Sequence, residues 1–546
     1  MRGKTRAAVV VGLSATALVA ASCGGGGGGG NTATNTGSGK SGGAITVRGC
    51  NPKADLIAAA TTETCGGDIM DITTARLVHY DSKNAKAEND LAESIEAKDN
   101  SKTFVIKINK GRKFQDGTEV KADNFIKAWN AAAYGPNGFE SGSFMEPIEG
   151  YAEVSDAKAT VKEMKGLKKV DDYTFEVKLT EPTSNFPVRL GYTAFAPMPD
   201  SFVNDPKNAT WGKKPIGAGP YQVMEWKNNE YVKLKKFADY GGKFGGKLDE
   251  ITFKIYQDSA AAYTDLRAGK IDVTDEIPTK SILGGIYKTE VPNRWALRND
   301  TGVIQMIGFV SEKADPKVQN PKFKQAVSMA IDRKLIIEKI FNNARKPATS
   351  WVAAGAVGDY PTDGCGEYCE YNPEKAKAKL AEAGGFTGTL TISYNGDASH
   401  KEWVDATCTS IKNALGFDCQ GDPKVDFKTF LNSIKADETK GMYRYGWQMD
   451  YPSPQNFMTP IYTKGAGSNY NKYYNEPFEK KLKEADQAPN ETEGAKKYYE
   501  AEKMLRDNMP TVPTWGAAAY TAWSEKVTNV NITAFGKPDY TQITMK

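Results

Sequence analysis

The sequence predicts an α/β fold of two or three domains, on three observations. Strand-like and helix-like segments alternate along the chain, which is typical of a layered α/β architecture. The chain has 546 residues, and the roughly 500 that follow its N-terminal leader are enough for two or three domains. Charged residues make up 25% of the chain and hydrophobic residues 40%, which is an ordinary globular composition.

The leader itself resembles that of a bacterial lipoprotein. A basic head precedes an apolar stretch of about 15 residues, which is too short to span a bilayer. Small residues then lead to Cys23, although Ala20 stands where a leucine is usual. We therefore expect a signal peptide at residues 1–22, a lipid on Cys23 and a flexible Gly-rich tether over 23–43. The alternative is an ordinary secretory signal with an incidental cysteine.

This leader predicts a body held by its lipid on the extracellular face of the bacterial cytoplasmic membrane. No later segment approaches the 18 consecutive apolar residues of a membrane-spanning helix. The formal charge is +4, and three of the positive charges lie in the leader, so the charge balance gives no reason to expect a nucleic-acid partner.

Histidine is scarce, because the chain contains only His79 and His400. Histidine-rich metal sites and most histidine-based catalysis are therefore not expected. The sequence also contains no H-E-x-x-H motif. We expect a protein that is not an enzyme and that has no metal and no cofactor.

Six cysteines remain after Cys23, an even number that fits an exported protein with disulfide bonds. They form three pairs that are close in sequence: Cys50 and Cys65, Cys365 and Cys369, Cys408 and Cys419. Six cysteines allow 15 connectivities, so the sequence does not fix the pairing. Short loops favour bonds within each close pair. A zinc site at Cys365 and Cys369 is the alternative, although no further ligand lies close by in sequence.

The first part of the chain contains two strands and a helix with clear periodicity. Residues 103–109 (TFVIKIN) and 173–179 (YTFEVKL) alternate apolar and polar side chains, which predicts half-buried strands. Between them, Phe125, Trp129 and two alanines recur at helical spacing and predict an amphipathic helix.

Later helices have recognisable starts and stops. Asn320 followed by proline predicts a helix over 320–331, and Asp332 can cap a second helix that buries Leu335, Ile336 and Ile340. Residues 372–384 repeat the Asn-Pro start, with glycine 384 as a left-handed stop. These signals describe packing and reveal no function by themselves.

Seven segments in a fixed order resemble the dipeptide- and oligopeptide-binding proteins of ABC importers, family 5 of the extracellular solute-binding proteins. The seven segments are 91–96 with 113–125 (KFQDGTEVKADNF), 217–221 (GAGPY), 266–273 (LRAGKIDV), 320–333, 371–384, 446–451 (GWQMDY) and 509–513 (MPTVP). Each segment alone is weak evidence, but together they cover the chain from about residue 43 to its end. Lys121 and Asn124 depart from the usual residues, and both lie in packing segments.

The resemblance implies a bilobed periplasmic-binding-protein type II fold of the large peptide-binding class, with an extra inserted subdomain. Lobe I is expected to comprise residues 44–75, 185–298 and 512–546, with the inserted subdomain at 76–184. Lobe II is expected at 299–511. The ligand of such proteins binds between the lobes, which close around it on hinge strands near residues 298 and 511.

The same resemblance assigns the candidate ligand site. In peptide-binding relatives the aspartate of the segment at 446–451 holds the α-ammonium group of the ligand, a role that falls on Asp450. This is chemically sound, because a buried ammonium needs a fixed negative partner. The other candidate ligand-binding residues are Trp447, which lies beside the peptide, Gly446 and Gln448, whose backbones can pair with it, Arg444, and Tyr451.

The function expected from these features is capture of oligopeptides or dipeptides by a monomeric receptor, which passes them to a membrane permease driven by ATPase subunits. Two alternatives remain open. The same fold can bind an oligosaccharide or another small solute, and the protein can act as a sensor of peptide signals.

Overall fold

The computed structural model describes residues 37–207, 211–396, 398–425 and 427–546. The predicted signal peptide and the lipid attachment at Cys23 lie outside these residues. The last part of the predicted tether is described, and it is bonded to the folded body: Lys40 forms a β-bridge with Met545, and the N–H of Gly42 donates to the carbonyl of Lys247. Residues 40 and 42 therefore belong to the folded body, because they pair with segments near the end of the chain and with Lys247.

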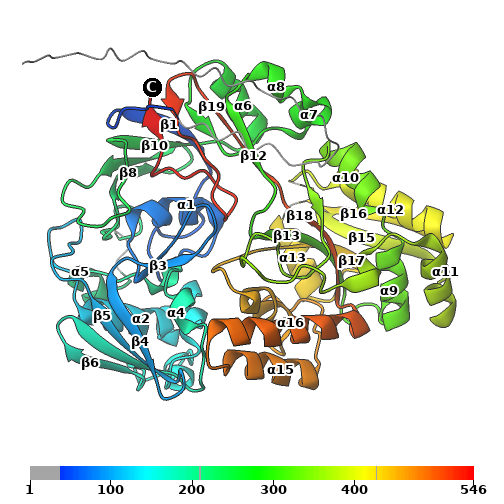
Figure 1. Ribbon diagram of the computed structural model, residues 1–546, viewed down its shortest axis with the longest axis horizontal. Helices are drawn as coiled ribbons and strands as arrows, with labels where there is room; N and C mark the ends of the chain where they lie inside the picture. The colour runs from blue at the N-terminus through cyan, green and yellow to red at the C-terminus, as the bar shows by residue number, and fades with distance from the viewer. Residues whose placement is uncertain (1–36, 208–210, 397, 426) are drawn as a thin grey trace, which may run out of the picture. The chain divides into compact units, whose positions relative to one another are not determined.

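Among the described residues, seven strands form the first sheet. The central strand β1 (Ala44–Gly49) is parallel to β10 (Glu250–Ile255) and to the short β11 (Val273–Thr274), whereas the outer strands are antiparallel. The outer strands are β8 (Tyr221–Lys227), β9 (Tyr231–Lys236), β12 (Trp295–Arg298) and β19 (Ala519–Trp523). Segments far apart in sequence thus share one sheet (Figure 1).

Six described strands form the second sheet, in the order β14-β18-β13-β17-β15-β16. Their bounds are β13 Val303–Phe309, β14 Lys346–Pro347, β15 Thr389–Asn395, β16 Asp418–Lys424, β17 Met442–Gln448 and β18 Thr511–Gly516. The whole of β18 pairs within this sheet. The chain therefore leaves the second sheet after Gly516. The predicted domain division, with its hinge strand near residue 511, stays a prediction.

A separate four-stranded antiparallel sheet lies within the predicted inserted subdomain. Its strands are β4 (Ala92–Lys98), β5 (Thr103–Ile108), β7 (Thr174–Lys178) and β6 (Leu167–Asp171). Phe104, Ile106, Phe175 and Val177 are fully buried, and α2 (Ala122–Ala133) buries Phe125 and Trp129. The two strands and the helix expected here are confirmed. Two short pairs complete the described strands: β2 (Val78–Tyr80) with β3 (Ala87–Asn89), and β20 (Val527–Thr528) with β21 (Thr544–Met545).

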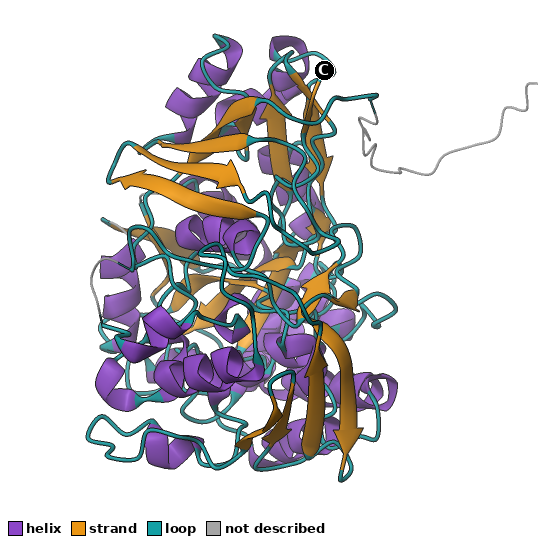
Figure 2. Ribbon diagram, turned by 90° about the vertical axis from the view of Figure 1, so that its left-hand side faces the viewer, coloured by secondary structure: helices purple, strands orange, loops and turns teal. Residues whose placement is uncertain are grey.

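Helices flank the strands of the sheets (Figure 2). Those before residue 299 are α1 Thr64–Thr73, α2, α3 Tyr151–Val154, α4 Phe186–Arg189, α5 Asp200–Asn204, α6 Ser259–Arg267, α7 Thr279–Ile282 and α8 Tyr287–Glu290. Those after it are α9 Pro321–Met329, α10 Arg333–Phe341, α11 Pro373–Glu382, α12 Lys401–Leu415, α13 Phe427–Lys435, α14 Thr459–Tyr462, α15 Glu476–Asp486 and α16 Glu491–Asn508. None of the described helices has both the length and the apolar character needed to span a bilayer.

The capping predictions for α10 are right, but its buried face is not the predicted one. The side chain of Asp332 accepts from the N–H of Leu335, as a cap should. Leu335 itself is 48% exposed, and Ile340 is only half-buried. The helix buries Ile336, as predicted, together with Arg333, Ile337 and Phe341, so its contact face is rotated by about one residue from the expected one.

Two large hydrophobic clusters follow the two large sheets, and one side chain crosses between them. Tyr451 comes three residues after β17 of the second sheet, yet its ring belongs to the cluster built on the first sheet and the inserted subdomain. Phe535 is packed against both clusters. The segment that carries the candidate ligand site therefore lies at the contact between the two cores.

Three disulfide bonds join Cys50 to Cys65, Cys365 to Cys369 and Cys408 to Cys419. These are the pairings that the short loops favour. We expect thiol titration of the denatured, unreduced mature protein to find no free thiol from these six cysteines. Two or more reactive thiols would contradict the structural role and reopen metal binding at Cys365 and Cys369.

Candidate functional site

The six candidate residues lie along β17 and in the turn after it. Gly446, Trp447 and Gln448 end the strand, and Asp450 and Tyr451 follow directly. Strand β17 is fixed in the middle of the second sheet by its full-length antiparallel pairing with β13. The sheet thus presents this segment on a rigid element, which suits a binding site.

One edge of β17 is open over the candidate residues. In an antiparallel pair, backbone groups point alternately toward and away from the partner strand. The bonds at the two ends, from Val310 N–H to the Gly441 carbonyl and from Met449 N–H to the Gly302 carbonyl, show that the odd-numbered residues face β13. The backbone groups of Gly446 and Gln448 therefore point to the other side.

On that other side, β15 pairs with β17 only at Met442 and Tyr443 within the described residues. The N–H and C=O groups of Gly446 and Gln448 consequently face an edge without a strand. An extended peptide can add to such an edge through main-chain hydrogen bonds, which give affinity without reading side chains.

Asp450 is a half-buried carboxylate with no cationic side chain within ion-pair distance among the described residues. Removal from water raises the pKa of Asp450 to about 6, and a hydrogen bond from Asn456 acts in the opposite direction. A shielded carboxylate without a cation is costly to maintain. The arrangement therefore favours a ligand that brings a positive charge.

Asn456 binds both Trp447 and Asp450, and it is not among the residues predicted from the sequence. It lies in the short 3-10 helix Pro454–Phe457 and is 2% exposed. Its Oδ1 accepts from Trp447 Nε1 at 3.1 Å and from the backbone N–H of Asp450 at 2.9 Å. Its Nδ2 donates to Asp450 Oδ2 at 2.9 Å.

Arg444 lies on the same strand but is held by other partners. Its Nε donates to Asn395 Oδ1 at 2.8 Å, and its guanidinium lies 5.1 Å from the ring centre of Phe427 and 5.5 Å from that of Phe430. These contacts anchor the side chain toward β15 and α13. A role of Arg444 toward a ligand carboxylate stays a prediction.

Gln448 and Tyr451, on either side of Asp450, contact Phe535 and Arg189, which lie far from them in sequence. Gln448 Nε2 donates to the carbonyl of Phe535 at 3.2 Å. The ring of Tyr451 lies 5.7 Å from the guanidinium of the buried Arg189, and its hydroxyl donates to Gln455. Asp450 therefore lies between two residues that contact segments distant in sequence.

Arg189 belongs to a wider polar contact, which we call the Arg189 seam. It comprises Ser184, Asn185 and Arg189, near α4, with Asp486 and Tyr498, from α15 and α16. The Ser184 N–H donates to the Asp486 carbonyl at 2.8 Å, and Asn185 Nδ2 donates to the Tyr498 hydroxyl at 2.9 Å. Arg189 Nη2 lies 3.6 Å from Asp486 Oδ1, and the Tyr498 hydroxyl also donates to Asp486.

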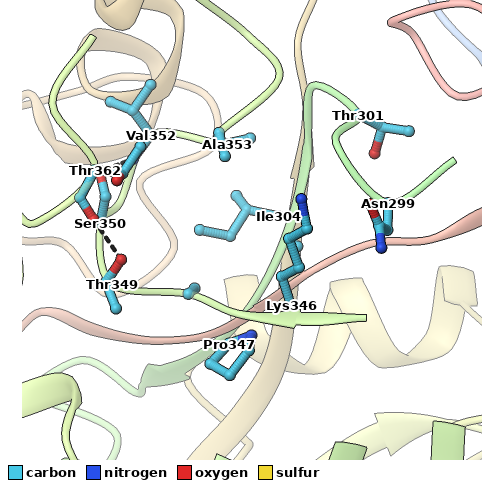
Figure 3. Close-up of a pocket in the computed structure, with 13 residues that line it drawn as sticks. Asn299, Thr301, Ile304, Lys346, Pro347, Thr349, Ser350, Val352, Ala353 and Thr362 are labelled. Atoms are coloured by element: carbon cyan, nitrogen blue, oxygen red, sulfur yellow. Dashed lines mark hydrogen bonds between the residues drawn. The ribbon is translucent and has the colours of Figure 1, made fainter. Parts of the chain in front are cut away.

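A small pocket elsewhere does not contain the candidate residues. It lies where the chain enters the second sheet, is about 40 Å³ in volume, and is lined by Asn299, Thr301, Lys346 and Gly516 among others (Figure 3). The hydroxyl of Thr349 on its wall donates to the carbonyl of Thr362. This volume suits one or two water molecules and is too small for a peptide.

The described residues contain no group of three or more His, Cys, Asp or Glu side chains placed to hold a metal ion. The arrangement at β17 offers instead an open strand edge, an indole and an uncompensated carboxylate. These groups can bind a cationic chain, and none of them forms an acid–base or nucleophilic pair with another.

Comparison with protein families decides the identity of the chain. Residues 86–469 match the model described as bacterial extracellular solute-binding proteins, family 5, middle part. The chain belongs to this family. Its fold is the bilobed type II fold of periplasmic binding proteins, mixed α/β with several sheets, as the sequence predicted.

Curated relatives cover most of this chain. Heme-binding protein A of Haemophilus influenzae is 26% identical over 84% of both chains, and periplasmic oligopeptide-binding protein OppA of Salmonella typhimurium is 26% identical over 78% of both. Among solved structures, Haemophilus influenzae OppA in complex with the peptide RPPGFSPFR has a TM-score of 0.75 at 21% identity, covering 92% of this chain and 98% of that one.

Proposed function

We propose that this protein captures peptides by their free amino terminus and hands them to the permease of an ABC importer. The observation that carries the proposal is Asp450, a shielded carboxylate with no cationic partner among the described residues, beside the open edge of β17. The peptide ammonium supplies the missing charge, and the peptide backbone adds to the strand edge at Gly446 and Gln448. Relatives named for oligopeptide binding support the same ligand class.

Calorimetry with tri-alanine and with its N-acetylated form tests this proposal. We expect the free-amine peptide to bind and the acetylated peptide to bind much more weakly, because acetylation removes the ammonium group. Equal binding of the two peptides would exclude Asp450 as an ammonium anchor. Binding of a neutral oligosaccharide or of haem without any peptide binding would replace the proposed ligand class.

The affinity for a free-amine peptide should also depend on pH. The pKa of Asp450 is about 6 without ligand, and a bound ammonium lowers it, so binding releases a proton at acidic pH. Affinity should be highest near pH 7 and should fall as the pH drops through 6; it should also fall near pH 8, where the amino terminus of the peptide loses its proton. Dissociation constants from pH 5 to 8 measure this, and the Asp450→Asn variant should lack the fall at acidic pH.

We also propose that the receptor is held on the outer face of the cytoplasmic membrane by a lipid on Cys23. The support is the basic head, short apolar core and small-residue approach to this cysteine in the sequence. The Cys23→Ala variant should move from the membrane fraction to the medium. A variant that remains with the membranes would contradict the anchor.

A further inference from the structure

The orientation of the Asn456 side chain is fixed by its surroundings. Two N–H donors, the indole of Trp447 and the backbone of Asp450, converge on one end of the amide. Neither donor can accept a hydrogen bond, so this end must be the carbonyl oxygen. The amide NH₂ is therefore forced toward the carboxylate of Asp450, to whose Oδ2 it donates at 2.9 Å.

The backbone brings Asn456 to this place through a compact turn. The Ser453 side chain accepts from the N–H of Gln455, and the N–H of Asn456 donates to the carbonyl of Ser453. The buried Tyr451 hydroxyl donates to Gln455 Oε1 at 2.5 Å, which fastens the turn to the segment that carries Asp450. Asn456 thus reaches Asp450 from a rigid support.

One oxygen of the Asp450 carboxylate remains able to accept a hydrogen bond from a ligand. Asp450 Oδ2 and the backbone N–H are both engaged by Asn456, whereas Oδ1 has no hydrogen-bond partner within the described part of the chain. The Asn456 amide donates to only one oxygen of Asp450. This hydrogen bond stabilises the charged form of the carboxylate and leaves the other oxygen able to accept from a ligand.

We propose that Asn456 is the positioning residue of the ammonium site, which holds the Asp450 carboxylate and the Trp447 indole in one fixed arrangement before the ligand arrives. This inference rests on the proposed function for its ligand. Such pre-organisation reduces the ordering cost of binding and strengthens the interaction with the ammonium. The loss of Asn456 should therefore weaken binding even though the residue need not touch the ligand.

The Asn456→Asp variant keeps the shape and the accepting oxygen of the side chain, but it replaces the NH₂ donor with a second carboxylate oxygen and so adds a negative charge beside Asp450. We expect the affinity for tri-alanine at pH 7 to fall by about 10- to 100-fold, as for a lost hydrogen bond to a charged group. The pH at which binding is half lost should rise by about one unit or more, because two adjacent carboxyl groups share a proton.

Asn469→Asp is the matched control. Asn469 is also a buried amide of the same lobe, and it donates to the carbonyls of Thr463 and Tyr473, away from Asp450. Its replacement should lower stability and leave the pH of half-loss unchanged. Asn456→Ser, which removes the donor without adding charge, serves if the aspartate variant does not fold, and it should move the pH in the same direction.

A measurement without ligand separates this inference from the proposed function. Carbon-13 NMR of the ligand-free protein, with the Asp450 signal assigned by its loss in Asp450→Asn, gives the pKa of that group directly. We expect a higher pKa in both Asn456 variants. An unchanged pKa would overturn the positioning role whether or not the wild type binds tri-alanine; failure of tri-alanine to bind, with the pKa raised, would overturn the peptide function alone.

Discussion

Asp450→Asn is expected to weaken the binding of a free-amine peptide by about 30- to several-thousand-fold. This range corresponds to the roughly 2–5 kcal/mol lost when one partner of a buried charge pair is removed, much of it from leaving the other charge unpaired. Asparagine keeps the shape of the side chain, so the change tests charge and not packing.

The matching change in the ligand is N-acetylation, and the two changes form a double-mutant cycle. Calorimetry of both proteins with both peptides should show that each single change weakens binding strongly, while the second change adds little once the first is present. Asp437→Asn is the matched protein control: its side chain is 6% exposed, but it is paired with Lys472 and Lys313. It should leave the cycle unchanged. Additive effects would rule out a direct Asp450–ammonium contact.

Features that depend on a few neighbouring residues could be predicted from the sequence. Asn320 and Asn372 cap their helices through side-chain bonds to N–H groups two and three residues ahead. Gly384 adopts a φ of +85°, the left-handed stop expected of it. Each of these signals is complete within one helical turn, so no knowledge of the tertiary fold was needed.

Features that depend on distant packing were missed or misplaced. Leu335 was expected in the core, but the neighbours of α10 cover the adjacent face, and propensity cannot tell which face of a short apolar helix is covered. The sequence predicts a hinge strand near residue 511 but not its partners; β18 runs to Gly516 because β13 and β14 pair with it there.

The residues of the candidate site also fall into those that the sequence predicts and those that only the structure reveals. The sequence motif led to Trp447 and Asp450, but their common partner Asn456 is recognised only from three hydrogen bonds around one amide. The Ser-Pro start of its turn was the only local signal. Arg189 gave no signal at all, because its seam joins residues such as Asn185 and Asp486 that lie 301 positions apart.

Breaking the Arg189 seam is expected to loosen closure and to weaken peptide binding. Arg189 is 8% exposed, and Asp486 is the carboxylate nearest to it across the seam, at 3.6 Å. Asp486→Asn or Arg189→Met strands one buried charge, which is strongly destabilising for the closed arrangement. The seam joins α4 to α15 and α16, which the predicted domain division places in different lobes, so we expect affinity to fall by about 10-fold, mainly through faster dissociation.

The double variant Arg189→Met/Asp486→Asn removes both charges and should recover part of this loss, since no unpaired charge remains. Glu181→Gln is the matched control, because Glu181 pairs with Lys483 across the same seam but both side chains are about half exposed. An exposed pair is worth at most about 1 kcal/mol, so this variant should bind almost as the wild type does.

Small-angle scattering completes the test by measuring closure itself. Saturating peptide should reduce the radius of gyration of the wild type, and the single seam variants should need more peptide to reach the same value. A profile that does not change in the wild type, with binding confirmed by calorimetry, would indicate a rigid scaffold. If the seam variants reach the smaller radius of gyration at the same peptide concentration as the wild type, the seam does not stabilise closure. The Tyr451 and Gln448 contacts beside Asp450 would then be the contacts that do.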